Sequence, residues 1–128
     1  MLIGKSLHLH WEELACKDGT PYPSKFITDG RVIELVVMFE RIRDIWQLPL
    51  TILSAYRTVS HNKKVSGAKN SMHLQGKALD LMPPGGVSIT EFYKILYAQT
   101  KELGIRGIGK YSTFVHVDTR ESKELVTW

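Results

Sequence analysis

Apolar residues recur at every third or fourth position in two long stretches, and each stretch predicts an amphipathic helix. The first stretch follows Asp29, a helix-capping residue type, and the second runs over 89–103 and ends at Gly104. The apolar positions of the first helix are Val32, Leu35, Val36, Phe39, Ile42 and Trp46. Both apolar faces are expected to be part of the core, and a cofactor site on them is disfavoured. Shorter helices are expected at 11–14 and around 60–65.

Four short segments have the composition of strands. Residues 50–53 and 77–81 are expected to form buried strands, and 106–111 and 114–118 to form two more around a turn. Helices packed on a small antiparallel sheet are the simplest combination of these elements, so the predicted fold class is α+β. The stretch 54–71 is polar and has few large apolar residues, and loops this long in a compact domain are often functional.

The composition is that of an ordinary globular protein, with 43% hydrophobic and 23% charged residues among 128. One domain, 1–128, is expected, and disordered, collagen-like and membrane-spanning classes are excluded. Cys16 is the only cysteine, which excludes an intramolecular disulfide framework and is typical of a protein made in a reducing cytosol. A small buried core thiol is the favoured interpretation of Cys16.

The N-terminus has no uninterrupted apolar region and no small-residue cleavage site, so no Sec signal peptide is expected and synthesis in the cytoplasm is predicted. The formal net charge of +4 favours anionic partners, but the excess is spread along the chain. Because no stripe of basic residues interleaves with aromatic residues, nucleic acid is not an expected partner. Neither helical face is larger than one core needs, so a monomer is expected.

Two of the five histidines, His73 and His116, are each followed by an aspartate at a spacing that can bring the two side chains together. His73 precedes Asp80 by seven positions, across a predicted turn at Gly76 that can fold the imidazole back beside the strand. His116 and Asp118 are two positions apart on a strand, so they share a face. A plain half-buried strand whose polar side faces water would show the same alternation, and spacing alone leaves both interpretations open.

Two imidazoles and one carboxylate, from His73, Asp80 and His116, suit a zinc ion whose fourth position stays open for water. An open position is typical of catalytic zinc, whereas structural zinc sites are usually closed and rich in cysteine. Iron in oxygenases uses a similar triad, but on a jelly-roll barrel that needs more strands than this chain predicts. The residues therefore favour a catalytic zinc site.

Three segments resemble peptidase family M15, in particular its D-alanyl-D-alanine carboxypeptidase-like branch, which is common in phages and prophages. They are LSAYRT at 53–58, SMHLQGKALD at 71–80 and GIGKYSTFVHVDTR at 107–120. The opening HWEELACKDG at 10–19 is also similar to the start of that domain. The resemblance thus covers nearly the whole chain.

The resemblance implies a hedgehog/DD-peptidase-like zinc peptidase fold and hydrolysis of an amide bond in peptidoglycan stem peptides. The implied metal ligands are His73, Asp80 and His116, with one zinc ion that activates a water. Arg57 takes the position of an arginine that helps to polarise the scissile carbonyl, a role that suits a fixed guanidinium beside developing negative charge. The alternative for Arg57 is a structural ion pair.

One departure from the family concerns the general base. Many relatives place an ionisable residue two or three positions before the last zinc ligand, where this chain has Thr113 and Phe114. Asp118 can accept the proton instead, or it can orient the imidazole of a ligand. His61 is a weaker candidate for the base.

Several residues near the motifs are secondary candidates. Tyr111, Tyr56 and Ser71 are candidate substrate-binding residues, although tyrosines at strand ends are usually packing residues and Ser71 is a good loop-stabilising residue. His8 and His10 could mimic a metal pair, but they lack a nearby acid and are expected to be ordinary surface or core histidines.

A peptidase without a signal peptide must reach the cell wall after lysis, through a holin-type pore, or as part of a virion. Such an enzyme would be either a D-Ala-D-Ala carboxypeptidase or an endolysin-type endopeptidase. The alternative from another class is a non-catalytic zinc-binding module of a phage or prophage particle, which the missing upstream base favours.

Overall fold

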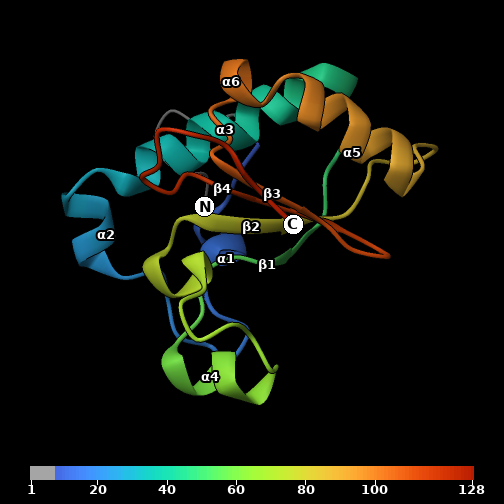
Figure 1. The fold of residues 1–128 in the computed structure, drawn as a ribbon. Coiled ribbons are helices and arrows are strands. Elements are labelled where there is room, and N and C mark those ends of the chain that lie inside the picture. Colours follow the sequence, from blue (N-terminus) through green and yellow to red (C-terminus); the bar gives the residue numbers. More distant parts are fainter. Residues whose placement is uncertain (1–7) are drawn as a thin grey trace.

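A five-stranded sheet forms the centre of the structure, a computed structural model that describes residues 8–128 (Figure 1). The expectation about a signal peptide concerns the N-terminus, of which residues 1–7 lie outside the described residues. In sheet order the strands are β1 (Ile52–Ser54), β2 (Ala78–Leu81), β4 (Val115–Asp118), β3 (Gly107–Lys110) and β5 (Val126–Thr127). The α+β class predicted from the sequence is confirmed.

The sheet is mixed rather than purely antiparallel. β1, β2, β4 and β3 pair antiparallel with their neighbours, as predicted, but β5 pairs parallel with β3. No sequence signal indicated β5, because it has only two residues and both are exposed. It is held at the edge by backbone hydrogen bonds that Val126 and Trp128 donate to Arg106 and Ile108.

The helices follow the predicted pattern with two differences. The expected helices are present as α1 (Trp11–Leu14), α3 (Arg31–Trp46), α4 (Val59–Lys64), α5 (Ile89–Ala98) and α6 (Thr100–Leu103). The predicted single helix over 89–103 is therefore two helices, because Gln99 has φ −124° and interrupts the helical backbone. The short helices α2 (Ser24–Thr28) and η1 (Met72–Gln75) had no strong periodic signal.

The N-cap of the long helix α3 lies one residue after the expected cap, Asp29. Gly30, at φ 85°, occupies the N-cap position, and the carboxylate of Asp29 accepts a hydrogen bond from the backbone N–H of Arg31 at 3.1 Å. Asp29 therefore satisfies a free donor of the first turn from the position before the cap. Glycine adopts this left-handed conformation without strain because glycine has no Cβ.

The hydrophobic core lies on the side of the sheet that α3, α5 and α6 cover (Figure 1). From the sheet it includes Leu79, Leu81, Ile108, Val115 and Val117, and from the helices Leu35, Phe39, Ile42, Phe92 and Leu96. The segment with η1 and α4 extends on the other side of β2 (Figure 1). Within residues 8–128, no helix is both long and apolar enough to cross a membrane.

Candidate active site

The second face of the central strands carries the ionisable residues. Asp80 on β2 and His116 on β4 are directly opposite each other in the antiparallel register. Asp118 follows on the same face of β4. Only 4% of Asp80, 6% of His116 and 0% of Asp118 is exposed, so the alternative of a polar face turned to water is wrong.

The turn before β2 brings His73 to these strands. Ser71 precedes η1, and its hydroxyl accepts a hydrogen bond from the backbone N–H of His73 at 3.2 Å. Gly76 ends η1 at φ 66°, and a Cβ there would lie 2.6 Å from the ring of Phe26. Glycine at this position therefore permits both the left-handed turn and the close packing that fold His73 back beside Asp80.

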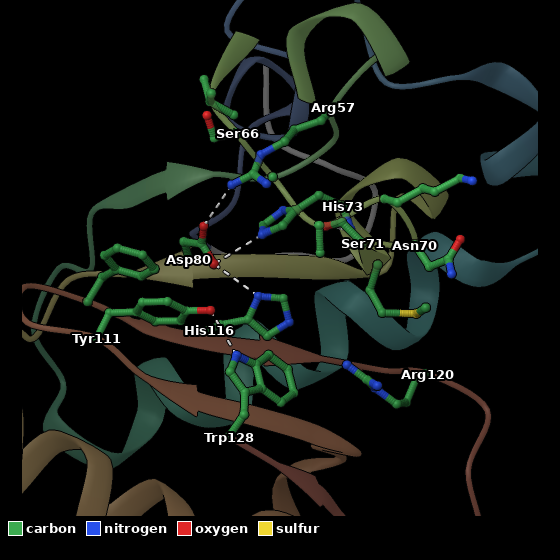
Figure 2. A pocket seen from close by; sticks show the side chains of 16 residues that line it. Arg57, Ser66, Asn70, Ser71, His73, Asp80, Tyr111, His116, Arg120 and Trp128 are labelled. Carbon is green, nitrogen blue, oxygen red and sulfur yellow. Dashed lines mark hydrogen bonds and ion pairs between the residues drawn. The ribbon is translucent and has the colours of Figure 1, made fainter. Parts of the chain in front are cut away.

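The three candidate metal ligands meet at one oxygen atom. Asp80 Oδ1 lies 3.0 Å from His73 Nε2 and 3.1 Å from His116 Nδ1. The donor atoms of the three residues all lie within 4.8 Å of one another. Figure 2 shows the two rings converging on the carboxylate from η1 and from β4.

The outer nitrogen of each ring has its own acceptor, and these acceptors define the tautomers. His73 Nδ1 lies 2.6 Å from the carbonyl oxygen of Ala55, so that nitrogen carries the proton. His116 Nε2 lies 2.8 Å from Asp118 Oδ2 and carries its proton for the same reason. In the neutral rings the inner nitrogens then present lone pairs to an oxygen that is also an acceptor. Three acceptors facing one point fit a bound cation.

The electrostatics of the site keep both carboxylates ionised. Burial favours the neutral form of Asp80, but the neighbouring imidazoles of His116 and His73 outweigh this effect and lower the pKa of Asp80. Burial likewise opposes ionisation of Asp118, whose pKa is nevertheless lowered to about 2 by hydrogen bonds from His116 and Arg120. Burial lowers the pKa of His73, so this ring is neutral near pH 7. Burial also opposes the charged form of His116, but bonds to Asp118 and Asp80 raise its pKa.

Arg57 reaches the same carboxylate from the segment after β1. Its Nη2 lies 3.2 Å from Asp80 Oδ2, while Nε donates to Ser54 Oγ and Nη1 to Asn62 Oδ1. Gly67 leaves room for this arrangement, since a Cβ there would collide with Asn62 and Nη1 of Arg57. The guanidinium is thus held in one orientation beside the three ligands.

The site lies at the base of an open cavity of about 730 Å³. Arg57, His73, Asp80 and His116 all line it, and so do the residues of the 65–72 loop. Tyr111, Phe114 and Trp128 form an aromatic wall on the other side, with the rings of Tyr111 and Phe114 stacked at 4.6 Å. Such a cavity can admit an extended peptide beside the ligands.

The comparison with known protein families agrees with this geometry. A model of the Peptidase M15 family matches residues 7–118. The chain belongs to the Peptidase M15 family. This confirms the family that the sequence motifs resembled, and it supports a peptidase that acts on a peptide substrate. No match was found among curated proteins.

In this M15 peptidase, Asp118 lies behind His116 and outside the cavity lining. Its carboxylate is bonded to His116 on one side, and Arg120 donates to it from Nε at 2.9 Å and from Nη2 at 2.7 Å. A Cβ on Gly107 of the neighbouring strand would collide with this carboxylate, so glycine makes room for it. The position favours the orienting role over the role of a general base in contact with substrate.

The other candidates from the sequence are distributed unevenly. Ser71 and Tyr111 line the cavity. Tyr56 does not, and its ring packs against those of Tyr22 and Phe26 at centroid distances of 6.2 and 6.0 Å. His61 is on α4, away from the lining. His8 Nδ1 pairs with Glu40 at 2.7 Å and His10 is the N-cap of α1, and neither belongs to a group of candidate metal ligands among the described residues.

Trp128 is a cavity residue that the sequence did not indicate, and it lies beyond the part of the chain that the family model matches. Its indole N–H donates to the hydroxyl of Tyr111 at 2.8 Å, and its ring lies 4.8 Å from that of His116 (Figure 2). The one feature of the sequence related to this contact is Gly109, which leaves room for the indole because a Cβ there would collide with it.

Proposed function

We propose that the protein is a zinc-dependent peptidase that hydrolyses an amide bond in peptidoglycan stem peptides. The observation that carries this proposal is the convergence of three potential ligand atoms, from His73, Asp80 and His116, in a peptide-sized cavity. Membership of the Peptidase M15 family supports the same chemistry, since peptidases of this family are typically zinc-dependent.

The donor set suits zinc, which binds imidazole nitrogen and carboxylate oxygen and keeps a position open in catalytic sites. Zinc at such a site polarises a carbonyl and makes water a stronger nucleophile near neutral pH. The protein's part is to hold the ligands ready. Ala55 and Asp118 each accept the outer N–H of one ring, so neither imidazole has to change its tautomer when the metal enters.

Arg57 is proposed to stabilise the negative charge that develops on the carbonyl oxygen of the scissile bond. The ion pair with Asp80, expected from the sequence as an alternative, is present, but the guanidinium also lines the cavity. A donor that is already oriented needs no rearrangement when charge develops, which makes it more useful to the transition state than to the ground state. Asp118 is proposed to act through His116 as a positioning residue.

The charges of the cavity support a substrate that carries carboxylates. Arg57, Lys69 and Arg120 line it, and among the described lining residues Asp80 is the one carboxylate. Ser71 and Tyr111 are proposed to contact the peptide from the two sides of the cavity. Stem peptides of peptidoglycan match this chemistry, and the enzyme would be a D-Ala-D-Ala carboxypeptidase or an endolysin-type endopeptidase that meets the wall after lysis or as a virion component.

Mass mapping of purified peptidoglycan tests the proposal. Incubation with the zinc-loaded protein is expected to release new peptide masses, which identify the bond that is cut and disappear with a chelator. The matched control is His116→Ala, which should release none. Unchanged masses from a preparation with a full complement of zinc would contradict the proposed substrate.

A second candidate function, a non-catalytic zinc-binding module of a phage or prophage particle, is favoured by one observation. Apart from Asp80, the described cavity lining has no carboxylate that could take a proton, and Thr113 and Phe114 precede the last ligand. Arg57→Gln separates the two functions. In an enzyme it should lower the rate about 10²–10³-fold while zinc stays bound, whereas a binding module would show no hydrolysis before or after the change.

A further inference from the structure

A second group of metal-ligating side chains lies outside the catalytic cavity. Cys16, Asp18 and His61 place a thiol, a carboxylate and an imidazole so that one ligand atom of each lies within 4.8 Å of the others. None of the three is among the described residues that line the cavity. The group joins parts of the chain more than forty positions apart, so tertiary folding and not local sequence assembles it.

A hydrogen-bonded turn fixes two of the three residues. The backbone N–H of Cys16 donates to Thr20 at 2.8 Å, and that of Gly19 donates back to Cys16 at 3.0 Å. Inside this turn the backbone N–H of Thr20 donates to Asp18 Oδ1 at 2.9 Å. Cys16 and Asp18 are thus held on one short loop, and the second carboxylate oxygen of Asp18 faces Thr58.

Thr58 connects this turn to α4, which carries His61. Its hydroxyl donates a hydrogen bond to Asp18 Oδ2 at 2.7 Å and accepts one from the backbone N–H of His61 at 3.1 Å. Oγ1 of Thr58 also lies 3.9 Å from Cys16 Sγ. Figure 1 shows the segment after α1 reaching down to α4, where these contacts occur.

The side chain of Cys16 is buried beside polar groups. Only 3% of the residue is exposed, so it is a buried thiol, as the sequence predicted. Its sulfur lies 3.9 Å from the hydroxyl of Thr58 and within 4.8 Å of ligand atoms of Asp18 and His61. Asp18 is exposed and His61 is half-buried, which leaves a path for an ion from solvent.

We propose that Cys16, Asp18 and His61 form a second zinc site, distinct from the catalytic one. A soft thiolate with an imidazole and a carboxylate selects zinc over magnesium or calcium, which prefer sites made of oxygen alone. Three protein ligands leave the fourth position to water or to the hydroxyl of Thr58. The ion would join the 16–20 turn to α4 directly after Arg57, and so would stiffen the segment that presents the guanidinium to the catalytic cavity.

Cobalt(II) is the probe that separates the two sites, because only this one contains sulfur. Cys16 is the only cysteine of the chain, so a thiolate-to-cobalt charge-transfer band in the near ultraviolet can arise in the monomer from this site alone. The full-length protein, kept reduced, is expected to bind two cobalt ions per chain and to show the band. Cys16→Ser should abolish the band and leave one ion.

The catalytic-site variant His73→Ala serves as the reciprocal control, because it should also leave one ion but retain the band. His61→Ala keeps the thiol and tests the same site without removing the buried residue, and circular dichroism verifies its fold. It too should lose the band. One ion per chain without the band in the parent protein, or a band that survives in His61→Ala, overturns the proposal. Absence of peptidase activity in a protein that shows the band counts against the proposed function alone.

Discussion

The two faces of the central sheet are both buried, but by opposite means. On one face Leu79 and Val117 pack against apolar helix residues and are fully buried. On the other face, one position along the same strands, Asp80, His116 and Asp118 are almost as inaccessible. Burying charged groups is unfavourable unless each has a partner. The structure meets this requirement with reciprocal hydrogen bonds, and no buried side-chain polar atom of the described residues lacks a partner.

The difference indicates that alternation along a strand identifies faces but not what covers them. The apolar face is stabilised by area removed from water, which is not directional. The polar face depends on direction, because each nitrogen must meet one particular oxygen. Substitutions on the first face should therefore act on folding, and substitutions on the second should act on metal binding.

The largest effect is expected from Asp80→Asn, because this carboxylate is shared by both histidines and Arg57. The catalytic site should lose zinc affinity by more than the roughly 10–100-fold typical of an outer partner, and hydrolysis should stop with it. Competition with a chromophoric chelator measures the affinity, and Asp44→Asn at an exposed position of α3 is the matched control. Zinc held as tightly as in the parent protein would refute the assignment of this ligand.

A loss of folding stability without a loss of zinc affinity is expected from Leu79→Ala on the apolar face. The side chain is fully buried in the core, and its truncation should lower the free energy of unfolding by about 2–5 kcal/mol. Denaturant titration in the presence of chelator measures the stability, and zinc titration of the folded protein measures the affinity. An equal fall in zinc affinity would show that the two faces are not independent.

Asp118→Asn tests whether the polar face depends on charge or on shape, because it keeps the shape of the side chain and removes its negative charge. If Asp118 acts through His116, zinc affinity should fall about 10–100-fold, and Arg120→Lys should weaken zinc binding in the same direction. A general base would behave differently, with hydrolysis lost and zinc affinity retained. Measuring both quantities on the same preparation decides between the two roles.

The smallest effect is expected from Trp128→Phe at the edge of the polar face. It removes the hydrogen bond to the hydroxyl of Tyr111, and Trp128 is 47% exposed, so the free energy of unfolding should fall by about 0.5–1.5 kcal/mol at most. Tyr111→Phe removes the same bond from the other side. The double variant should then lose less stability than the sum of the two single losses, because the shared bond is lost only once, and strictly additive losses would show that the bond contributes nothing.

Much of this fold could be predicted from periodicity. The long helix α3, the strands β2 and β4 and the shared face of His116 and Asp118 all follow from spacing in the chain. The break at Gln99 and the parallel strand β5 could not be predicted, because the first interrupts a continuous apolar pattern and the second is too short to have one. The position of Tyr56 outside the cavity lining could not be predicted either, since a motif position does not say which way a ring packs.

The sequence was sufficient to predict most of the elements, the faces of the strands and the ligand types of the candidate catalytic site, because local spacing decides which side chains lie together on an element. Only the tertiary structure decided that the polar face is buried, that Asp118 lies behind His116, that Trp128 closes one wall, and that Cys16 meets His61. These facts depend on contacts between segments far apart in the chain, and their geometry is set by how the segments pack rather than by any local preference.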